Sequence, residues 1–267
     1  MRTVRAEVAY DGSRFFGWQR QAGFPSVQAA IEEAFLDLTG SAVTVHGSGR
    51  TDTGVHALRQ VAHAHVDSKL PDERLHHALN VHLADGVVIR ALETCDPDFH
   101  ARFSARGKRY AYLTATTPFR PPFGQAFHNW NRASLDLGAM RCAAADFRGR
   151  HDFRAFGNAG SPRKSTRRTI HGVRIHARRG RVAIVVQGEG FLFNMVRIMA
   201  GTLLEVGRGQ RSVDSVAQAL ASGIRTDAGA TAPANGLYLV RVLYDEPIFA
   251  GPRGAQDGSG AQSGAFS

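Results

Sequence analysis

The alternation of apolar and polar positions near the start of the chain predicts a strand over residues 3–10. Ser26 then precedes a stretch with helical periodicity, residues 27–38, and Gly40 follows it as a stop signal. The other elements predicted in the first hundred residues are strands at 42–46, 60–66 and 87–92 and a helix at 71–80. Their order, β-α-β-β-α-β, is that of a ferredoxin-like module.

The second part of the chain repeats this order with extra pieces inserted. We predict strands at 108–116, 170–175, 182–187 and 237–244 and helices at 135–147, 191–206 and 212–221. We therefore expect an α+β fold with one ferredoxin-like half at residues 1–104 and a second at 105–247. Residues 248–267 are rich in Gly and Ser and offer little to bury, so we expect a disordered tail.

The charge balance indicates a polyanionic partner. The 267 residues include 33 Lys and Arg against 23 Asp and Glu, a formal net charge of +10, which favours nucleic acid over a membrane surface. The longest stretch without a charged residue, 228–240, contains Pro233 and is shorter than the roughly 20 apolar residues of a membrane span. We expect no membrane association, and the first residues have no apolar segment typical of a secretory signal.

The cysteine content fits a reducing compartment. The chain has two cysteines, Cys95 and Cys142, which are far apart in sequence and form no CxxC pair. This spacing argues against a disulfide framework and against a thiolate zinc site, so we expect a cytoplasmic protein.

The segment richest in chemical information is 47–56, Gly-Ser-Gly-Arg-Thr-Asp-Thr-Gly-Val-His, between two predicted strands. Arg50 and Asp52 lie two positions apart, and an adjacent cation keeps a carboxylate ionised, as a nucleophile requires. The alternative is a tight turn in which Asp52 satisfies backbone N–H groups and Arg50 is solvated. The triplet Asp52-Thr53-Gly54 resembles the aspartic protease motif, but that chemistry needs two carboxylates and the triplet occurs once.

Basic residues cluster at two further places. Four lie in a predicted loop, Arg163, Lys164, Arg167 and Arg168, which is either a solvated surface or a loop that clamps RNA. Near the junction of the halves, cations alternate with aromatic side chains, a combination that holds single-stranded or flipped nucleotides. These residues are Arg102, Arg106, Lys108, Arg109, Phe99, Phe103, Tyr110 and Tyr112.

Arg197 interrupts an otherwise apolar predicted helix. It is expected either to meet an acidic or phosphate partner or to extend its guanidinium group into water. Among twelve histidines, His63 and His65 share a strand face, but no third ligand has a suitable spacing, so we expect no metal. The sequence contains no phosphate loop and no dinucleotide fingerprint, and we expect no cofactor.

The chain resembles the bacterial-type family of tRNA pseudouridine synthase A enzymes, in segments that follow the family order from about residue 3 to residue 245. The segments are Val8-Ala-Tyr-Asp-Gly12, Phe16-Gly-Trp-Gln-Arg20, Ser26-Val-Gln28, Gly49-Arg-Thr-Asp-Thr-Gly-Val-His-Ala57, Asn80-Val-His-Leu83, Asp98-Phe-His-Ala-Arg-Phe-Ser-Ala105, Lys108-Arg-Tyr-Ala-Tyr112, Phe191-Leu-Phe-Asn-Met-Val-Arg197 and Gly236-Leu-Tyr-Leu239.

The resemblance implies roles for individual residues. The family's catalytic aspartate falls on Asp52, its active-site tyrosine on Tyr110, and the arginine that pairs with the aspartate on Arg197. Arg50 matches the arginine that handles the flipped nucleotide. Thr53 departs from the pattern, because many members have Ala at this position.

The resemblance also implies the reaction and the assembly. A homodimer is expected to isomerise uridine to pseudouridine at positions 38, 39 and 40 in the anticodon stem-loop of tRNA, without a metal or cofactor. The halves are expected to share a mixed, mainly antiparallel sheet, with helices on one side and a basic cleft on the other. Three alternatives remain open: a synthase of this family that modifies another RNA, a non-catalytic RNA-binding protein on the same scaffold, and an aspartic-type hydrolase.

Overall fold

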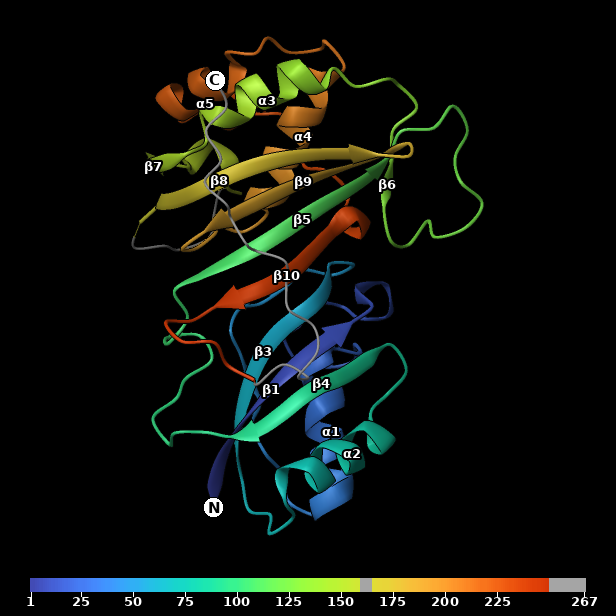
Figure 1. Cartoon of the computed structure of the whole chain (residues 1–267), viewed down its shortest axis with the longest axis vertical. Helices are drawn as coiled ribbons and strands as arrows, with labels where there is room; N and C mark the ends of the chain where they lie inside the picture. The colour runs from blue at the N-terminus through green and yellow to red at the C-terminus, as the bar shows by residue number, and fades with distance from the viewer. Residues whose placement is uncertain (159–164, 250–267) are drawn as a thin grey trace, which may run out of the picture.

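A computed structural model describes residues 1–158 and 165–249. Its strands form one ten-stranded sheet, and Figure 1 shows this sheet in front of the helices. The α+β class predicted from the sequence is confirmed. The expected tail lies outside the described residues except for Ile248 and Phe249, which pack against the core of the first half and so do not belong to a tail.

The first half contains four strands and two helices in the predicted order. The strands are β1 (Arg2–Tyr10), β2 (His46–Gly47), β3 (His56–Val66) and β4 (Val87–Thr94), and the helices are α1 (Val27–Thr39) and α2 (Asp72–His82). Ser26 caps α1 by accepting a hydrogen bond from the Ala29 N–H, and Gly40 ends it in the left-handed conformation. Both signals act as the sequence predicted.

The second half contains the same order with insertions. Its strands are β5 (Gly107–Ala115), β6 (Asn129–Trp130), β7 (Gly149–Asp152), β8 (Arg167–Arg178), β9 (Arg181–Gly188) and β10 (Leu237–Leu243), and its helices are α3 (Leu137–Ala145), α4 (Met195–Gly207) and α5 (Ser215–Ser222). The sequence pattern did not predict β6 and β7. Helix α4 begins later than the predicted residue 191, because Asn194 adopts a left-handed conformation with φ of 60°.

The last strand of the chain joins the two halves. The sheet order is β4-β1-β3-β10-β5-β9-β8-β7, with β2 paired to β3 and β6 to β5. Strand β10 is parallel to β3 and antiparallel to β5. In each half, the first strand lies between the last two strands of that half, β1 between β3 and β4 and β5 between β9 and β10, so the two halves share one topology. The mixed, mainly antiparallel sheet is thus as expected.

The prediction of a strand over residues 42–46 is wrong for most of that range. Only His46 and Gly47 pair with β3. The preceding N–H, that of Val45, donates instead to the buried carboxylate of Glu32 on α1, at 2.9 Å. This hydrogen bond holds the chain against the helix rather than against the strand.

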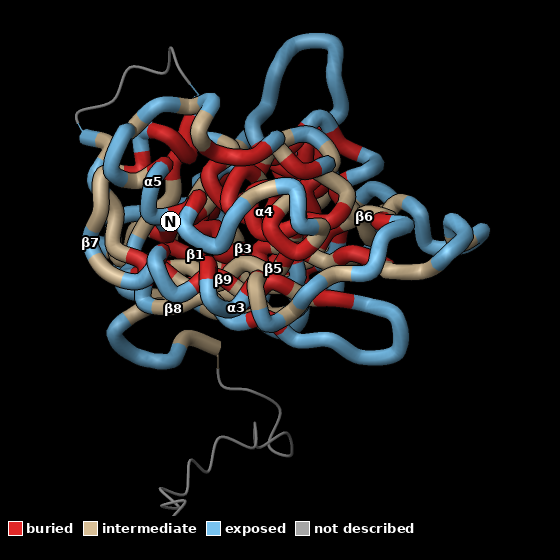
Figure 2. The backbone as a smooth tube through the Cα atoms, turned by 90° about the horizontal axis from the view of Figure 1, so that it is seen from above, coloured by how far each residue is buried: buried red, intermediate tan, exposed pale blue. Residues whose placement is uncertain are grey.

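Each half has a core of buried apolar side chains, and β10 contributes to both cores. Leu237 belongs to the core of the second half, and Leu239 belongs to that of the first. Tyr110, on the neighbouring strand β5, packs against both. Figure 2, a view from above, shows buried backbone in the middle of the molecule with exposed segments around it. The division into separate domains near residue 104 stays a prediction.

The segment after the 3₁₀ turn Arg225–Asp227 crosses α4 at very short range. A Cβ atom at Gly201 would lie 1.8 Å from the carbonyl oxygen of Ala230, so only glycine fits at this crossing. Glu205 of α4 accepts a hydrogen bond from the Ala230 N–H at 2.9 Å. This packing fixes the segment whose Ala232 carbonyl accepts a hydrogen bond from Arg197.

We predict that Gly201→Ala destabilises the protein. Alanine normally stabilises a helix by about 1 kcal/mol relative to glycine, but here its methyl group meets the Ala230 carbonyl and forces an overpacking cost of about 1–3 kcal/mol. Urea unfolding measures the change. Gly172→Ala is the matched control, since a Cβ there meets nothing within 4 Å. A free energy of unfolding that is higher for Gly201→Ala than for the wild type would show that the crossing of the segment over α4 is not tight.

Candidate functional site

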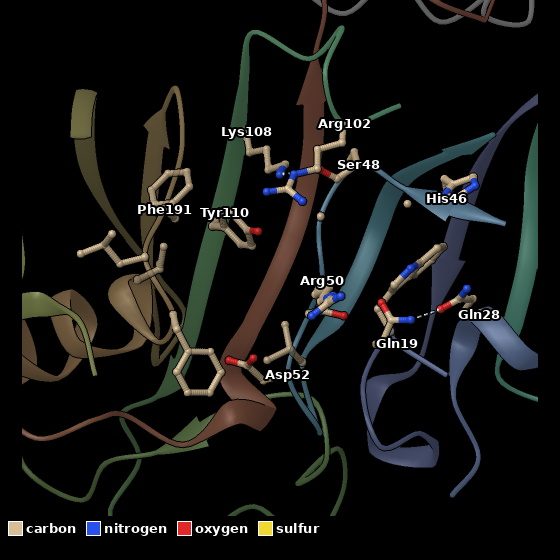
Figure 3. A pocket seen from close by; sticks show the side chains of 18 of the residues that line it. Gln19, Gln28, His46, Ser48, Arg50, Asp52, Arg102, Lys108, Tyr110 and Phe191 are labelled. Carbon is tan, nitrogen blue, oxygen red and sulfur yellow. Dashed lines mark hydrogen bonds between the residues drawn. The ribbon is translucent and has the colours of Figure 1, made fainter. Parts of the chain in front are cut away.

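A pocket of about 1060 Å³ lies where the two halves meet (Figure 3). Its walls come from the loop before α1, the segment from β2 to Asp52, the loop after β4, strand β5 and the residues that lead into α4. Among the described residues, its lining includes five cationic side chains and a single carboxylate. The cations are Arg20, Arg50, Arg102, Lys108 and Arg168, and the carboxylate is Asp52. This charge distribution suits an anionic ligand.

The pocket opens on the helix-bearing face of the sheet, whereas the expected cleft lay on the opposite face. Lys108 and Tyr110 line the pocket, and alternation along β5 puts Tyr112 on the same face. Tyr112 is fully buried in the core of the second half, which also contains side chains of α3 and α4. The expectation therefore assigned the cleft to the wrong face. The pocket occupies the space left between the helices of the two halves.

The loop that carries Asp52 is anchored on both sides of that residue. The hydroxyl groups of Thr51 and Tyr10 are 2.7 Å apart, and the Thr51 carbonyl accepts a hydrogen bond from the Trp18 N–H at 3.0 Å. The Asp52 carbonyl accepts from the Val55 N–H at 3.1 Å and closes a turn. These bonds fix the direction in which the Asp52 side chain leaves the backbone.

The Asp52 carboxylate is half-buried and faces the pocket. Burial raises the pKa of this carboxyl above its usual value, and the nearby Arg197 guanidinium offsets part of the increase. Within residues 1–158 and 165–249, no side chain forms a hydrogen bond or close ion pair with it. The expected charge pair with Arg50 is therefore absent; Arg50 is exposed and lines the pocket. The carboxylate is available to a ligand.

Arg197 is held by neighbours other than Asp52. Its Nε donates to the Ala232 carbonyl at 2.7 Å, and its Nη1 donates to Asn194 Oδ1 at 2.9 Å. Asn194 is positioned by its left-handed backbone, and the Ala232 carbonyl belongs to the segment that packs on Gly201. Arg197 thus acts on Asp52 across space, as a fixed positive charge beside the carboxyl.

Tyr110 lies beside Asp52 in the pocket (Figure 3). Its ring packs edge-on against Phe191, with ring centroids 5.1 Å apart. Burial, followed by the proximity of Tyr10 and Asp52, raises the pKa of the Tyr110 phenol well above its ordinary value. The phenol is therefore neutral at physiological pH and presents a hydroxyl group and a ring face to a ligand.

The predicted basic loop is described only in part, and its placement in a loop is wrong for Arg167 and Arg168, which begin strand β8. Arg168 lines the pocket and Arg167 does not. Arg163 and Lys164 lie outside the described residues. The pocket therefore unites Asp52, Tyr110, Arg50 and Arg168. Arg197, the residue after the lining residue Val196, lies near enough to Asp52 to influence its pKa.

Lys108 is a pocket residue that the sequence patterns did not single out. It was noted only as part of a basic cluster, yet it lines the pocket and its Nζ donates to the Ser48 carbonyl at 2.9 Å. The period-two alternation of β5 contained the signal, because it places Lys108 on the same strand face as Tyr110. The pattern could not show that this face borders a pocket.

In the part of the chain that the structure describes, no three His, Cys, Asp or Glu side chains gather in a way that holds a metal ion. Over the same residues, no helix has the length and apolarity needed to cross a membrane.

Comparison with known proteins adds an independent line of evidence. A family model described as tRNA pseudouridine synthase matches residues 6–104 and 143–245. A protein of Acetivibrio thermocellus named tRNA pseudouridine synthase A is 45% identical over 246 residues, which cover 91% of this chain and 100% of the relative. A relative of the same name from Syntrophotalea carbinolica is 44% identical over 91% of this chain and 97% of its own length.

We predict that Arg197→Gln raises the pKa of Asp52 further. Removing the cation takes away the interaction that favours the charged carboxylate, so only the effect of burial remains. Carbon-13 NMR titration of the Asp52 carboxyl measures the shift. Arg197→Lys keeps a positive charge and is expected to stay closer to wild type, and Arg102→Gln controls for a pocket arginine that does not influence Asp52. An unchanged pKa in Arg197→Gln would rule out the electrostatic role of Arg197.

Proposed function

The chain belongs to the tRNA pseudouridine synthase family, and from this membership we propose that Asp52 is the nucleophile of its reaction. The family name defines an isomerase that converts uridine in tRNA to pseudouridine. The observation that carries the proposal is that the described residues lining the pocket include five cations and a single carboxylate, that of Asp52. An RNA phosphate backbone matches the cations, and the carboxylate is left for the chemistry.

The reaction needs one nucleophile and proton transfers. The N1–C1′ glycosidic bond breaks, uracil turns, and C5 bonds to C1′ while the C5 proton is released and N1 regains a proton. An ionised Asp52 attacks either C1′ of the ribose or C6 of the base, and its ionisation is favoured by Arg197. The phenol of Tyr110 packs against the extruded base and exchanges a proton through its hydroxyl. No electrons are transferred, so the chemistry requires no redox cofactor.

The cations around this centre are proposed to bind the RNA. Arg50 lies in the same loop as Asp52 and is exposed, which suits a contact with the flipped nucleotide. Arg168 extends the basic lining. We propose that Arg163, Lys164 and Arg167, its neighbours in sequence, continue the RNA contact. A non-catalytic RNA-binding protein would have no use for the accessible Asp52.

We propose uridines 38, 39 and 40 of the anticodon stem-loop as the targets. The 45% identity with a relative named tRNA pseudouridine synthase A supports a tRNA substrate, and the choice of these positions follows from the family resemblance of the sequence. Modification of a different RNA by the same chemistry is the alternative outcome of the test below. A tRNA substrate is consistent with a cytoplasmic location.

We further propose a homodimer, since an anticodon stem-loop is longer than one pocket. The segment between β5 and β6 extends from the molecule (Figure 1) and carries Phe119 and Phe123, which are 83% and 85% exposed. Two large aromatic side chains on one projecting segment form a surface that a second copy of the chain can cover.

The catalytic proposal predicts tritium release from tRNA labelled at C5 of uridine. Wild-type protein is expected to release tritium from tRNAs with uridine at 38, 39 or 40, while Asp52→Asn binds the tRNA and loses at least about 10³-fold in rate. Asp52→Ala guards against deamidation of the asparagine. Asp85→Asn is the control for loss of an exposed carboxylate.

The outcomes separate the alternatives. Release by Asp52→Ala at the wild-type rate would exclude Asp52 as the nucleophile. Release from another RNA but not from these tRNAs would exclude the proposed targets and keep the reaction.

The assembly proposal predicts that Phe119→Ser combined with Phe123→Ser weakens the dimer. Sedimentation velocity at micromolar concentration is expected to show a dimer for wild type and a larger monomer fraction for the double variant. Phe24→Ser, which removes an aromatic residue that is 50% exposed elsewhere, is the control. A wild-type protein that sediments as a monomer and is fully active would contradict this proposal.

A further inference from the structure

The pocket extends well beyond Asp52 and Tyr110. Its volume of about 1060 Å³ is at the upper limit of the roughly 300–1,000 Å³ that small-molecule sites occupy. Figure 3 shows Lys108, Arg102 and Ser48 at the end away from Asp52, with Tyr110 between the two ends. The chemistry of a single flipped uridine does not use this second end, which leaves its residues to be explained.

An aromatic stack forms one side of this second end. The ring of Phe103 is 73% exposed although it lines the pocket. It lies on the ring of His100, with centroids 4.2 Å apart and an interplanar angle of 32°. The N–H groups of Arg102 and Phe103 both donate to His100 Nδ1, at 3.1 and 3.3 Å, so the imidazole supporting the phenyl ring is fixed. An exposed ring that packs on a fixed side chain beside cations is the usual platform for an unpaired base.

Lys108 and Arg102 form the other side of this end of the pocket, and neither has an acidic partner among the described residues. Lys108 Nζ meets only the neutral Ser48 carbonyl, and neither Lys108 nor Arg102 forms an ion pair with any described residue. Burial, together with the positive charge of Arg102, lowers the pKa of Lys108 to about 8. Two neighbouring cations, one of them largely desolvated, are stable together when an anion lies between them. Phosphate is the anion that RNA supplies.

We propose that this end of the pocket binds the nucleotide next to the target uridine, with its base on Phe103 and its phosphate between Lys108 and Arg102. The proposal rests on the proposed function, since it assumes a flipped uridine at Asp52. Holding the neighbouring nucleotide fixes the RNA backbone on one side of the target. The target uridine then has only to rotate about that fixed point to reach Asp52 and Tyr110.

The first test measures RNA binding by fluorescence anisotropy in the Asp52→Ala background, where no turnover occurs. Phe103→Ala and Lys108→Met are each expected to raise the Kd of an anticodon stem-loop RNA at least about fivefold. Lys108→Met is also expected to reduce the slope of log K against log salt by roughly 0.7, the value of one phosphate contact. Phe24→Ala and Lys69→Met remove an exposed Phe and Lys outside the pocket and are expected to change neither quantity.

The second test separates phosphate binding from a structural role, because Lys108 also supports the Ser48 carbonyl in the segment that leads to Asp52. RNAs are made with a methylphosphonate, or with an abasic residue, on the 5′ or the 3′ side of the target uridine. On the side of the target uridine where the neighbouring nucleotide enters this end of the pocket, the methylphosphonate is expected to abolish the effect of Lys108→Met on the Kd. On the same side, the abasic residue is expected to abolish the effect of Phe103→Ala.

The results have distinct meanings. A Lys108→Met variant that weakens every RNA by the same factor would assign Lys108 to loop support and overturn the phosphate contact. Wild-type affinity and salt slope in both variants would overturn the whole subsite. The proposed function fails separately, if the wild-type enzyme releases no tritium from the labelled tRNA.

Discussion

Strand β10 pairs with β3 through only two residue positions, and the geometry of the pocket depends on this short parallel contact. Leu239 lies opposite Ala57 of β3 on one side and opposite Tyr110 of β5 on the other. The loop with Asp52 ends just before β3, so the same row of residues brings Asp52 and Tyr110 together from different halves. The side chains strengthen the junction, because β10 contributes Leu237 to one core and Leu239 to the other.

The electrostatics of the pocket follow from that junction. Where the halves meet, the described lining residues place cations around the Asp52 carboxylate, and burial raises the pKa of that carboxyl. Arg197 counters this effect from a position fixed by Asn194 and the Ala232 carbonyl rather than by Asp52 itself. A cation fixed in this way favours the charged carboxylate without forming a hydrogen bond to it, which leaves the carboxylate oxygen atoms open to a substrate.

The sequence predicted the features that depend on local patterns. Period-two alternation located most strands, and Ser26 and Gly40 marked both ends of α1. The composition of the loop singled out Asp52. The sequence could not predict that Val45 bonds to Glu32 in place of β3, that Arg197 is held by a distant carbonyl, or that the cleft opens between the helices. Each of these depends on contacts between segments far apart in the chain, which no local periodicity encodes.

The central claim is that a uridine leaves its RNA and enters the pocket at Asp52. The most direct measurement is a structure of the Asp52→Asn variant bound to an anticodon stem-loop. We expect an unstacked target uridine with C1′ or C6 about 3–3.5 Å from the side chain of residue 52 and the Tyr110 ring against its base. A complex in which every uridine stays stacked in the RNA, with the RNA bound away from Asp52, would contradict this claim.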